Sequence, residues 1–281
     1  MKIGIVTDST SDLTPELIQQ HGIEVIPAIL IVDGQAYADG AGIAREDFYQ
    51  RLPGMRTSPT TAAPSIGEFA ARFEKLFEVG NEHIVCVHAA GQLTTIINSA
   101  RLAARDFPGR ITVLDSGSLS LGLGFQALAA AEVAQKNGSL EATLQAIHST
   151  RERTITRASL DTMEYIKRSG RVPHAVAALG EILNIKPLVA LKAGILKPLG
   201  ATRTTKQGNE RTLEMLLESG KLERLAVLHT NAPGRAHWLY DNFMQTAPQN
   251  APPGILQLIV TTVIGTHIGP NGVGFVAVKA A

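Results

Sequence analysis

The N-terminal part of the chain repeats one pattern three times: an apolar, β-branched run, a loop of small and hydroxyl-bearing residues, and a stretch with helical periodicity. The three loops lie at 8–13, 89–95 and 115–118. Strand, helix and strand in this order form the usual crossover of a parallel sheet. The repeat therefore predicts an α/β fold whose N-terminal parallel sheet has helices on both faces. It also gathers three polar loops at the carboxyl ends of the strands, where such sheets bind ligands.

Two segments between the first and second repeats have their own character. Residues 23–32 are apolar and β-branched enough to predict one strand. Residues 53–65 are rich in proline and hydroxyl groups and predict a loop, at the end of which Ser65 should cap a helix. Thr14 has the same capping role in front of Pro15.

After Arg153 the strands and helices alternate less regularly. A hairpin is predicted around the dipeptide 193–194 and a helix over 175–183. We therefore expect two α/β domains. The first is an N-terminal domain of residues 1–153, and the second is a C-terminal α+β domain of residues 154–281.

Residues 265–274 contain four glycines and lie between the apolar runs 256–260 and 275–278. They predict a glycine-rich loop between two strands. Glycine lets a backbone approach a ligand closely, and the imidazole of His267 can donate a hydrogen bond to an anion. Taken alone, the segment is also consistent with a long turn that carries a surface histidine, because Gly-Pro-Asn-Gly is ordinary turn chemistry.

The composition excludes several classes of partner. A net charge of +1 with 18% charged residues gives no reason to expect nucleic acid or an anionic membrane surface. No run reaches the ~18 apolar residues of a membrane span, and residues 1–7 predict a strand rather than a signal peptide. The single cysteine, Cys86, lies in an apolar run and is interpreted as a buried hydrophobe. We expect a cytoplasmic protein without stable membrane insertion.

No familiar catalytic or cofactor motif is present. The histidines lack metal-type spacing, and neither a phosphate-binding Gly-x-x-x-x-Gly-Lys-Ser/Thr loop nor a Gly-x-Ser-x-Gly elbow occurs. We therefore expect no metal, no cofactor and no catalytic residues. With only 5% aromatic residues, a cavity would be lined by aliphatic side chains. What remains is a set of loop donors that can hold the head of a small anion: Ser9, Thr61, Thr94, Ser116, Arg171 and His267.

Several short motifs resemble, in their order along the whole chain, those of the DegV family of bacterial fatty-acid-binding proteins. They are Asp8-Ser-Thr-Ser-Asp-Leu13, Thr61-x-x-Pro64-Ser65, Asp115-Ser116, Leu160-Asp161 with Gly170-Arg171, Ile185-Lys-Pro187 and His267-x-Gly-Pro-x-Gly272. The resemblance implies two α/β domains with one long-chain fatty acid in a buried tunnel between them, its carboxylate held by hydroxyls and a histidine. In some bacteria such proteins present the acyl group to a separate kinase that forms an acyl phosphate. A fatty-acid kinase subunit is thus an implied partner, and the binding protein itself catalyses nothing.

Carried over by position, the resemblance assigns carboxylate contacts to Thr61, Thr94 and His267 and includes Gly269 in the ligand loop. The family's serine becomes Thr94, in a loop that has lost other hydroxyls, and its Gly-Pro-Gly becomes Gly269-Pro270-Asn271. A threonine keeps the hydroxyl, so the binding chemistry is retained.

Two other functions remain open at this level. One is an enzyme of acyl or phosphoryl transfer with Ser9 or Thr94 as nucleophile and His267 as base, although the sequence shows no third group to orient the histidine. The other is a sensing protein in which the lipid reports its supply to a partner.

Overall fold

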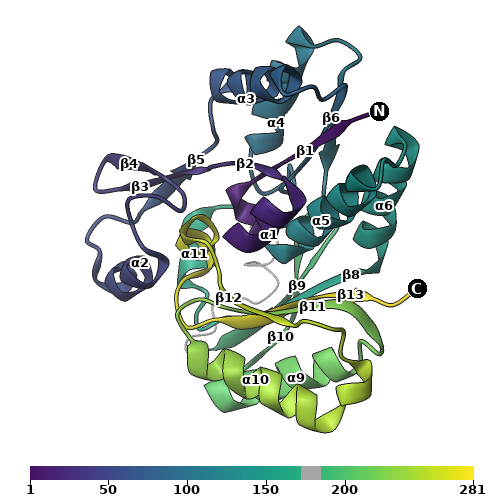
Figure 1. The fold of residues 1–281 in the computed structure, drawn as a ribbon. Coiled ribbons are helices and arrows are strands. Elements are labelled where there is room, and N and C mark those ends of the chain that lie inside the picture. Colours follow the sequence, from purple (N-terminus) through teal and green to yellow (C-terminus); the bar gives the residue numbers. More distant parts are fainter. Residues whose placement is uncertain (172–184) are drawn as a thin grey trace.

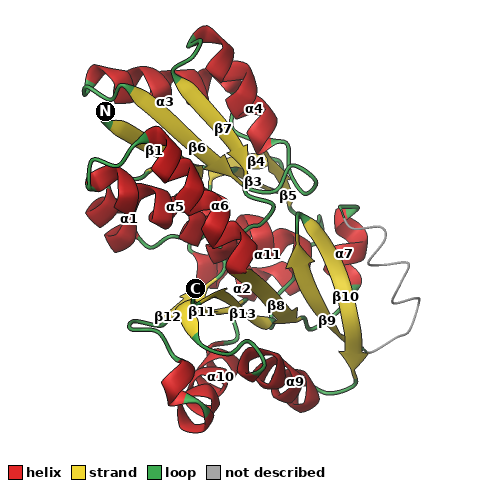
Figure 2. Ribbon diagram, turned by 90° about the vertical axis from the view of Figure 1, so that its right-hand side faces the viewer, coloured by secondary structure: helices red, strands yellow, loops and turns green. Residues whose placement is uncertain are grey.

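The computed structural model describes residues 1–171 and 185–281, and the predicted helix over 175–183 lies outside the described residues. Figures 1 and 2 show a smaller sheet with its helices in the upper half of the molecule and a larger sheet in the lower half.

The upper sheet is parallel and has the order β2-β1-β6-β7. Its strands are β1 (Ile3–Asp8), β2 (Glu24–Ile26), β6 (His83–His88) and β7 (Ile111–Asp115). Helices α3 (Ile66–Glu78) and α4 (Ile96–Ala103) pack on one face, and α1 (Pro15–His21), α5 (Leu121–Gln135) and α6 (Leu140–Arg153) pack on the other. The prediction of a parallel sheet covered on both faces is confirmed.

Helix caps follow the predicted chemistry. The hydroxyl of Thr14 accepts a hydrogen bond from the backbone N–H of Leu17 at the start of α1. Ser65 accepts one from Glu68 at the start of α3. Such caps satisfy backbone donors that the helix itself leaves unpaired.

A small antiparallel sheet of order β4-β3-β5 corrects two predictions. It contains β3 (Ile29–Val32), β4 (Gln35–Ala38) and β5 (Thr60–Ala62), and the helix α2 (Arg45–Arg51) lies between β4 and β5 in the chain. Residues 23–32 are not one strand, because Pro27 has no backbone N–H to continue the ladder and the chain changes sheet there. Residues 53–65 are not only loop, because residues 60–62 form β5, in which Thr61 pairs with Leu30 of β3.

The lower sheet has six strands in the order β10-β9-β8-β13-β11-β12. They are β8 (Thr154–Ser159), β9 (Lys186–Lys192), β10 (Ile195–Thr202), β11 (Leu222–His229), β12 (Leu256–Ile259) and β13 (Val273–Lys279). Helices α9 (Thr205–Leu217) and α10 (Pro233–Thr246) cover its outer face, and α7 (Glu164–Ser169) follows β8. One-turn helices occupy Ser9–Ser11, Leu52–Gly54, Ala104–Asp106 and Pro248–Asn250. The predicted hairpin joins β9 and β10 through Ala193 and Gly194, both at positive φ.

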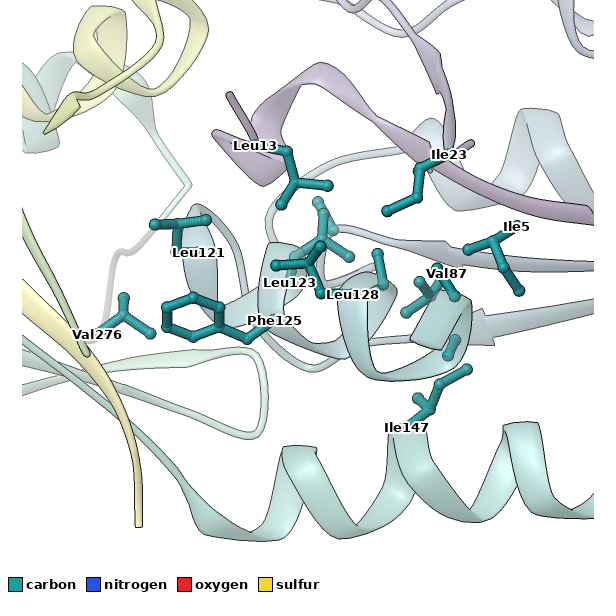
Figure 3. Packing of buried hydrophobic residues seen from close by; sticks show 14 of the residues in the cluster. Ile5, Leu13, Ile23, Val87, Leu121, Leu123, Phe125, Leu128, Ile147 and Val276 are labelled. Carbon is teal, nitrogen blue, oxygen red and sulfur yellow. The ribbon is translucent and has the colours of Figure 1, made fainter. Parts of the chain in front are cut away.

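Helix α5 is the centre of the main hydrophobic core. Every residue from Leu121 to Ala131 is buried, and all of them except Gln126 are apolar, as expected for a helix enclosed by other elements. One side packs on the upper sheet through Ile5, and the other packs on the lower sheet through Val276 (Figure 3). The two halves of the chain therefore share one core.

Helix α11 (Thr262–Ile268) corrects the prediction of a loop over residues 265–274, of which only residues 269–272 are loop. The chain leaves β12, forms this helix between the two halves, and returns into β13 (Figure 1). Position 265 has no room for a side chain, because the ring and hydroxyl of Tyr49 occupy the space where a Cβ would lie. This packing accounts for a glycine inside the helix. His267 is consequently held on a helix rather than on a flexible turn.

Candidate functional site

A cavity of about 180 Å³ lies between the lower sheet and the loops at the carboxyl edge of the upper sheet. One buried water needs about 10–15 Å³ of such space, and well-packed interiors rarely leave larger voids. The cavity therefore has room for a ligand of many atoms.

Most side chains that line the cavity are aliphatic, and they come from both halves of the chain. Leu93 and Leu119 belong to the N-terminal half, whereas Leu160, Val189, Leu191, Leu228 and Ile264 belong to the C-terminal half. Arg157 also borders the cavity. The side chain of Arg157 lies on the same strand face as Ile155 and Ser159, which point toward the α9–α10 layer. Arg157 therefore lines the cavity with its backbone atoms and not with its guanidinium.

The polar end of the cavity is formed by Thr61, His267 and Arg171. Nε2 of His267 lies 2.9 Å from Oγ1 of Thr61, and Nδ1 lies 3.4 Å from a guanidinium nitrogen of Arg171. Because a guanidinium can only donate, Nδ1 is the acceptor and Nε2 carries the proton. His267 then donates to the oxygen of Thr61, and the hydroxyl hydrogen of Thr61 is left to donate to a ligand.

His267 is neutral at physiological pH. Burial, and then the positive charge of Arg171, lower the pKa of His267 to about 4. Its role is therefore that of a fixed hydrogen-bond donor, not of a cation.

Thr94 supplies a second hydroxyl. It lines the same cavity, and its Oγ1 accepts a hydrogen bond from the backbone N–H of Ile96 at 3.4 Å. With a lone pair so occupied, this hydroxyl can also donate into the cavity. Among the described residues that line the cavity, none carries a carboxylate. The electrostatic environment thus favours an anion at the polar end.

A second pocket, of about 250 Å³, adjoins this polar end. It shares Ser169, Arg171 and His267 with the first cavity and is lined further by exposed residues, among them Ser58 and Arg168. The polar end of the apolar cavity thus borders a pocket at the protein surface.

Three of the predicted site residues do not line the cavity. The hydroxyl of Ser9 accepts from the N–H of Ala28 at 3.0 Å, and the hydroxyl of Ser116 donates to the carbonyl of Ser118 at 3.1 Å. Gly269 has a φ of 78°, and an added Cβ would lie 2.2 Å from the ring of Tyr165. Backbone geometry and packing therefore account for this glycine.

Sequence reasoning missed other hydroxyls at the cavity, namely those of Thr10, Ser120, Thr156, Ser169 and Thr230. Thr10 directly follows Ser9, and a loop sequence alone does not show which neighbouring hydroxyl faces inward. The hydroxyl of Thr10 donates to Asp8, and that of Thr230 accepts from the N–H of Gly272 at 2.7 Å. Both therefore also stabilise local structure.

An Asp–His pair was also missed. Oδ2 of Asp8 lies 3.0 Å from Nδ1 of His88, and both side chains are fully buried at the adjacent ends of β1 and β6. His88 does not line the cavity, and its Nε2 has no hydrogen-bond partner among the described residues. This pair lies beneath the site and does not orient His267.

The described residues provide no group of three or more side chains that could hold a metal ion. None of the helices in the described part of the chain has the length and apolar character that a membrane-spanning segment needs.

Together, the fold and the cavity define an α/β protein of two main sheets that surrounds a mostly aliphatic cavity, with hydroxyls, a neutral histidine and an arginine at its polar end. The chain belongs to the DegV family, since the family model described as an uncharacterised protein of the DegV family matches residues 2–280.

Similar proteins cover nearly the same length. A DegV domain-containing protein of Streptomyces coelicolor is 33% identical over 276 residues, which is 98% of this chain and 97% of the relative. A DegV family protein from Thermus thermophilus, whose structure is described as fatty acid binding, is 33% identical with a TM-score of 0.91, and the match covers 100% of both chains. DegV from Bacillus subtilis, described as a fatty acid binding protein, is 27% identical with a TM-score of 0.87, and the match covers 99% of this chain and 100% of that one.

Proposed function

We propose that this protein binds one long-chain fatty acid, with the acyl chain in the aliphatic cavity and the carboxylate at the polar end. The observation that carries this proposal is the pairing of Thr61 with a neutral His267, beside Arg171, at one end of a cavity whose described lining is mostly aliphatic. The descriptions of the Thermus thermophilus and Bacillus subtilis proteins support the same ligand class.

Burial of the acyl chain supplies the affinity. About 14 methylenes at ~0.8 kcal/mol each contribute on the order of 11 kcal/mol before the cost of association. No bond needs to form or break for tight binding. The protein in this proposal is a carrier and not an enzyme.

The carboxylate requires hydrogen bonds, because an unpaired charge at an apolar cavity is strongly unfavourable. The hydroxyls of Thr61 and Thr94 are the donors, and His267 holds the hydroxyl of Thr61 in the donating orientation. Arg171 in turn fixes the tautomer of His267 and adds a positive charge at the mouth.

We further propose that residues 1–153 and 154–281 act as two domains that enclose the lipid in the cytosol. The carboxylate then lies beside the surface pocket that contains Arg168 and Arg171. A kinase subunit that makes acyl phosphates could reach the carboxylate through this pocket while the acyl chain stays covered.

The experiment is mass spectrometry of lipids extracted under denaturing conditions from the purified protein. We expect a stoichiometric fatty acid after expression in a lipid-replete host. Repeated empty extractions, together with no uptake of added fatty acid, would reject the proposal. Incubation with acyl-CoA or ATP tests the alternative of acyl or phosphoryl transfer, for which we expect neither product nor covalent adduct.

A further inference from the structure

We infer that Asp12, Asp39, Arg45 and Tyr49 are positioning residues for the ligand site, because together they hold residues 259–262 and thereby the helix that carries His267. We call these four residues the α11 clamp. The inference rests on the proposed function, since the position of His267 matters for binding only if the cavity holds an acid.

Asp12 and Arg45 form hydrogen bonds with the backbone where β12 ends. Oδ1 of Asp12 accepts a hydrogen bond from the N–H of Thr261 at 2.8 Å, and the guanidinium of Arg45 donates to the carbonyl of Ile259 at 2.6 Å. Arg45 also lies 3.0 Å from Oδ1 of Asp12, and Ser120 donates to Oδ2 at 2.6 Å. The carboxylate thus joins the first loop, the start of α5 and the start of α11.

Asp12 has the left-handed backbone, with a φ of 54°. That conformation is unfavourable for most residues other than glycine, asparagine and aspartate. Its side chain is fully buried among the partners just named. The chain therefore places a buried acid, in a backbone conformation that aspartate tolerates, at the point where it contacts α11.

Tyr49 and Asp39 hold the first turn of α11 from its other side. The hydroxyl of Tyr49 donates to the carbonyl of Val260 at 3.0 Å and lies 3.3 Å from that of Thr261. Asp39 accepts from the hydroxyls of Thr261 and Thr262, the latter at 3.0 Å. All of these partners are buried.

The face of α11 that these contacts orient is the face that lines the cavity. Val260, Val263, Ile264, His267 and Ile268 all border it. Their spacing of three and four residues places them on one side of a helix. A rotation or shift of α11 would therefore move the imidazole and the apolar wall together.

Both partners of the Thr61–His267 contact are in this way positioned by the N-terminal half. Thr61 belongs to β5, which pairs with β3. The four residues of the α11 clamp also lie in the N-terminal half of the chain. The six-stranded sheet supplies the chain that enters and leaves α11 and one backbone hydrogen bond, from the N–H of Val260 to the carbonyl of His229 at 2.8 Å. The side-chain hydrogen bonds described above for residues 259–262 come from the N-terminal half. The clamp residues themselves do not line the cavity, so they act through α11 and not by touching a ligand.

The test is a double-mutant cycle on fatty-acid affinity with Tyr49→Phe and Asp12→Asn, each alone and combined with Thr61→Val. If the clamp acts through the His267–Thr61 contact, each clamp variant weakens binding about tenfold in the natural background and has almost no further effect beside Thr61→Val. Arg45→Lys, which keeps a cationic donor, should bind nearly as well as the natural protein, whereas Arg45→Met should not. Tyr240→Phe and Asp47→Asn are the matched controls, because Tyr240 packs in the α9–α10 layer and Asp47 is an exposed residue of α2.

A second measurement does not depend on a ligand. Nitrogen-15 spectra of the imidazoles, with His267 assigned by its loss in His267→Ala, should show a protonated Nε2 in the natural protein and a changed signal in Tyr49→Phe. A thermal scan of each variant establishes that it is folded. Folded clamp variants with unchanged affinity and an unchanged His267 signal would overturn the inference, as would equal losses of affinity in both Thr61 backgrounds. A natural protein that takes up no fatty acid would instead overturn the proposed function.

Discussion

At the scale of single residues, the site depends on neutral donors whose hydrogens are directed by their neighbours. Arg171 makes His267 a donor through Nε2, and His267 makes Thr61 a donor into the cavity. The residue types at this end could be predicted from the sequence, because loop hydroxyls and one histidine are suited to an anion. The direction of the hydrogen bonds between them could not be predicted, since it depends on which ring nitrogen of His267 contacts the guanidinium of Arg171.

We predict that His267→Ala and Thr61→Val each weaken fatty-acid binding by about 1–3 kcal/mol, the cost of leaving a buried polar partner unpaired. Calorimetric titration with a fatty acid short enough to remain monomeric gives the affinity. Ser116→Ala serves as the comparison, because this hydroxyl bonds within its own loop and not at the cavity. Unchanged affinity in both site variants would remove the two residues from the carboxylate site.

Because the pKa of His267 is lowered to about 4, the imidazole keeps the same protonation state from pH 6.5 to pH 8. A carboxylate held by an ordinary imidazolium would lose affinity as the pH rises through about 6.5. We expect the affinity to change by less than about twofold across this range, which titrations at several pH values can measure. A steep loss of affinity toward pH 8 would show that the histidine binds as a cation.

Asp12 makes a different pH prediction, on stability. Burial raises the pKa of Asp12 from 3.8 to about 6 in spite of Arg45 and its hydrogen bonds. A folded-state pKa above the unfolded value means that the stabilising effect is full below about pH 4 and is lost as the pH rises through about 6. The natural protein should therefore lose on the order of 2–3 kcal/mol relative to Asp12→Asn between pH 4 and pH 7. Denaturant unfolding of both proteins at each pH measures this difference, and a constant difference would contradict the prediction.

At the scale of elements, the long periodic segments were predictable and the short ones at the site were not. The parallel sheet, its flanking helices and the β9–β10 hairpin follow from local pattern. Strand β5 and helix α11 were predicted as loops, because their stabilising partners are far away in the sequence. Thr61 pairs with Leu30 across the small sheet, and the first turn of α11 is held by residues more than 200 positions earlier.

Gly265 allows a direct test of how tightly α11 is held. We predict that Gly265→Ala destabilises the ligand-free protein by about 1–3 kcal/mol, because the new methyl group would overlap the ring of Tyr49. Gly234→Ala is the matched control in α10, since no atom lies within 4 Å of an added Cβ there. Alanine is the better helix former, so the control should be neutral or slightly more stable than the natural protein. The same outcome for Gly265→Ala would mean that the packing against Tyr49 is loose.

At the scale of the whole molecule, the cavity is formed only when the two halves are together. Its lining comes from residues 10–120 of the N-terminal half and from residues 156–275 of the C-terminal half. The expectation of a ligand site between two sheets could be formed from the sequence, but the shape and length of the cavity depend on how aliphatic side chains from both halves meet.

We predict that a bound fatty acid stabilises the whole molecule against heat. A ligand that binds only the folded state adds about 2.7 kcal/mol when its free concentration is one hundred times its dissociation constant. Scanning calorimetry of delipidated protein, with and without added fatty acid, should therefore show a higher midpoint when the lipid is present. A methyl ester of the same chain length should raise the midpoint less, because it is a weaker acceptor for Thr61 and Thr94. Equal shifts from acid and ester would mean that the head group is not recognised.

Helix α5 has a consequence for how a lipid can be exchanged. It is buried on all sides, with Leu121 to Ala131 packed between Ile5 of the upper sheet and Val276 of the lower one. A hinge motion that swung the halves apart would expose this apolar helix to water at a cost of about 25 cal/mol for each Å² uncovered. We therefore expect the halves to behave as one rigid unit while lipid enters and leaves. The route must then be a local opening of surface segments over the cavity, so the exchange rate should follow the stability of those segments and not that of the whole fold.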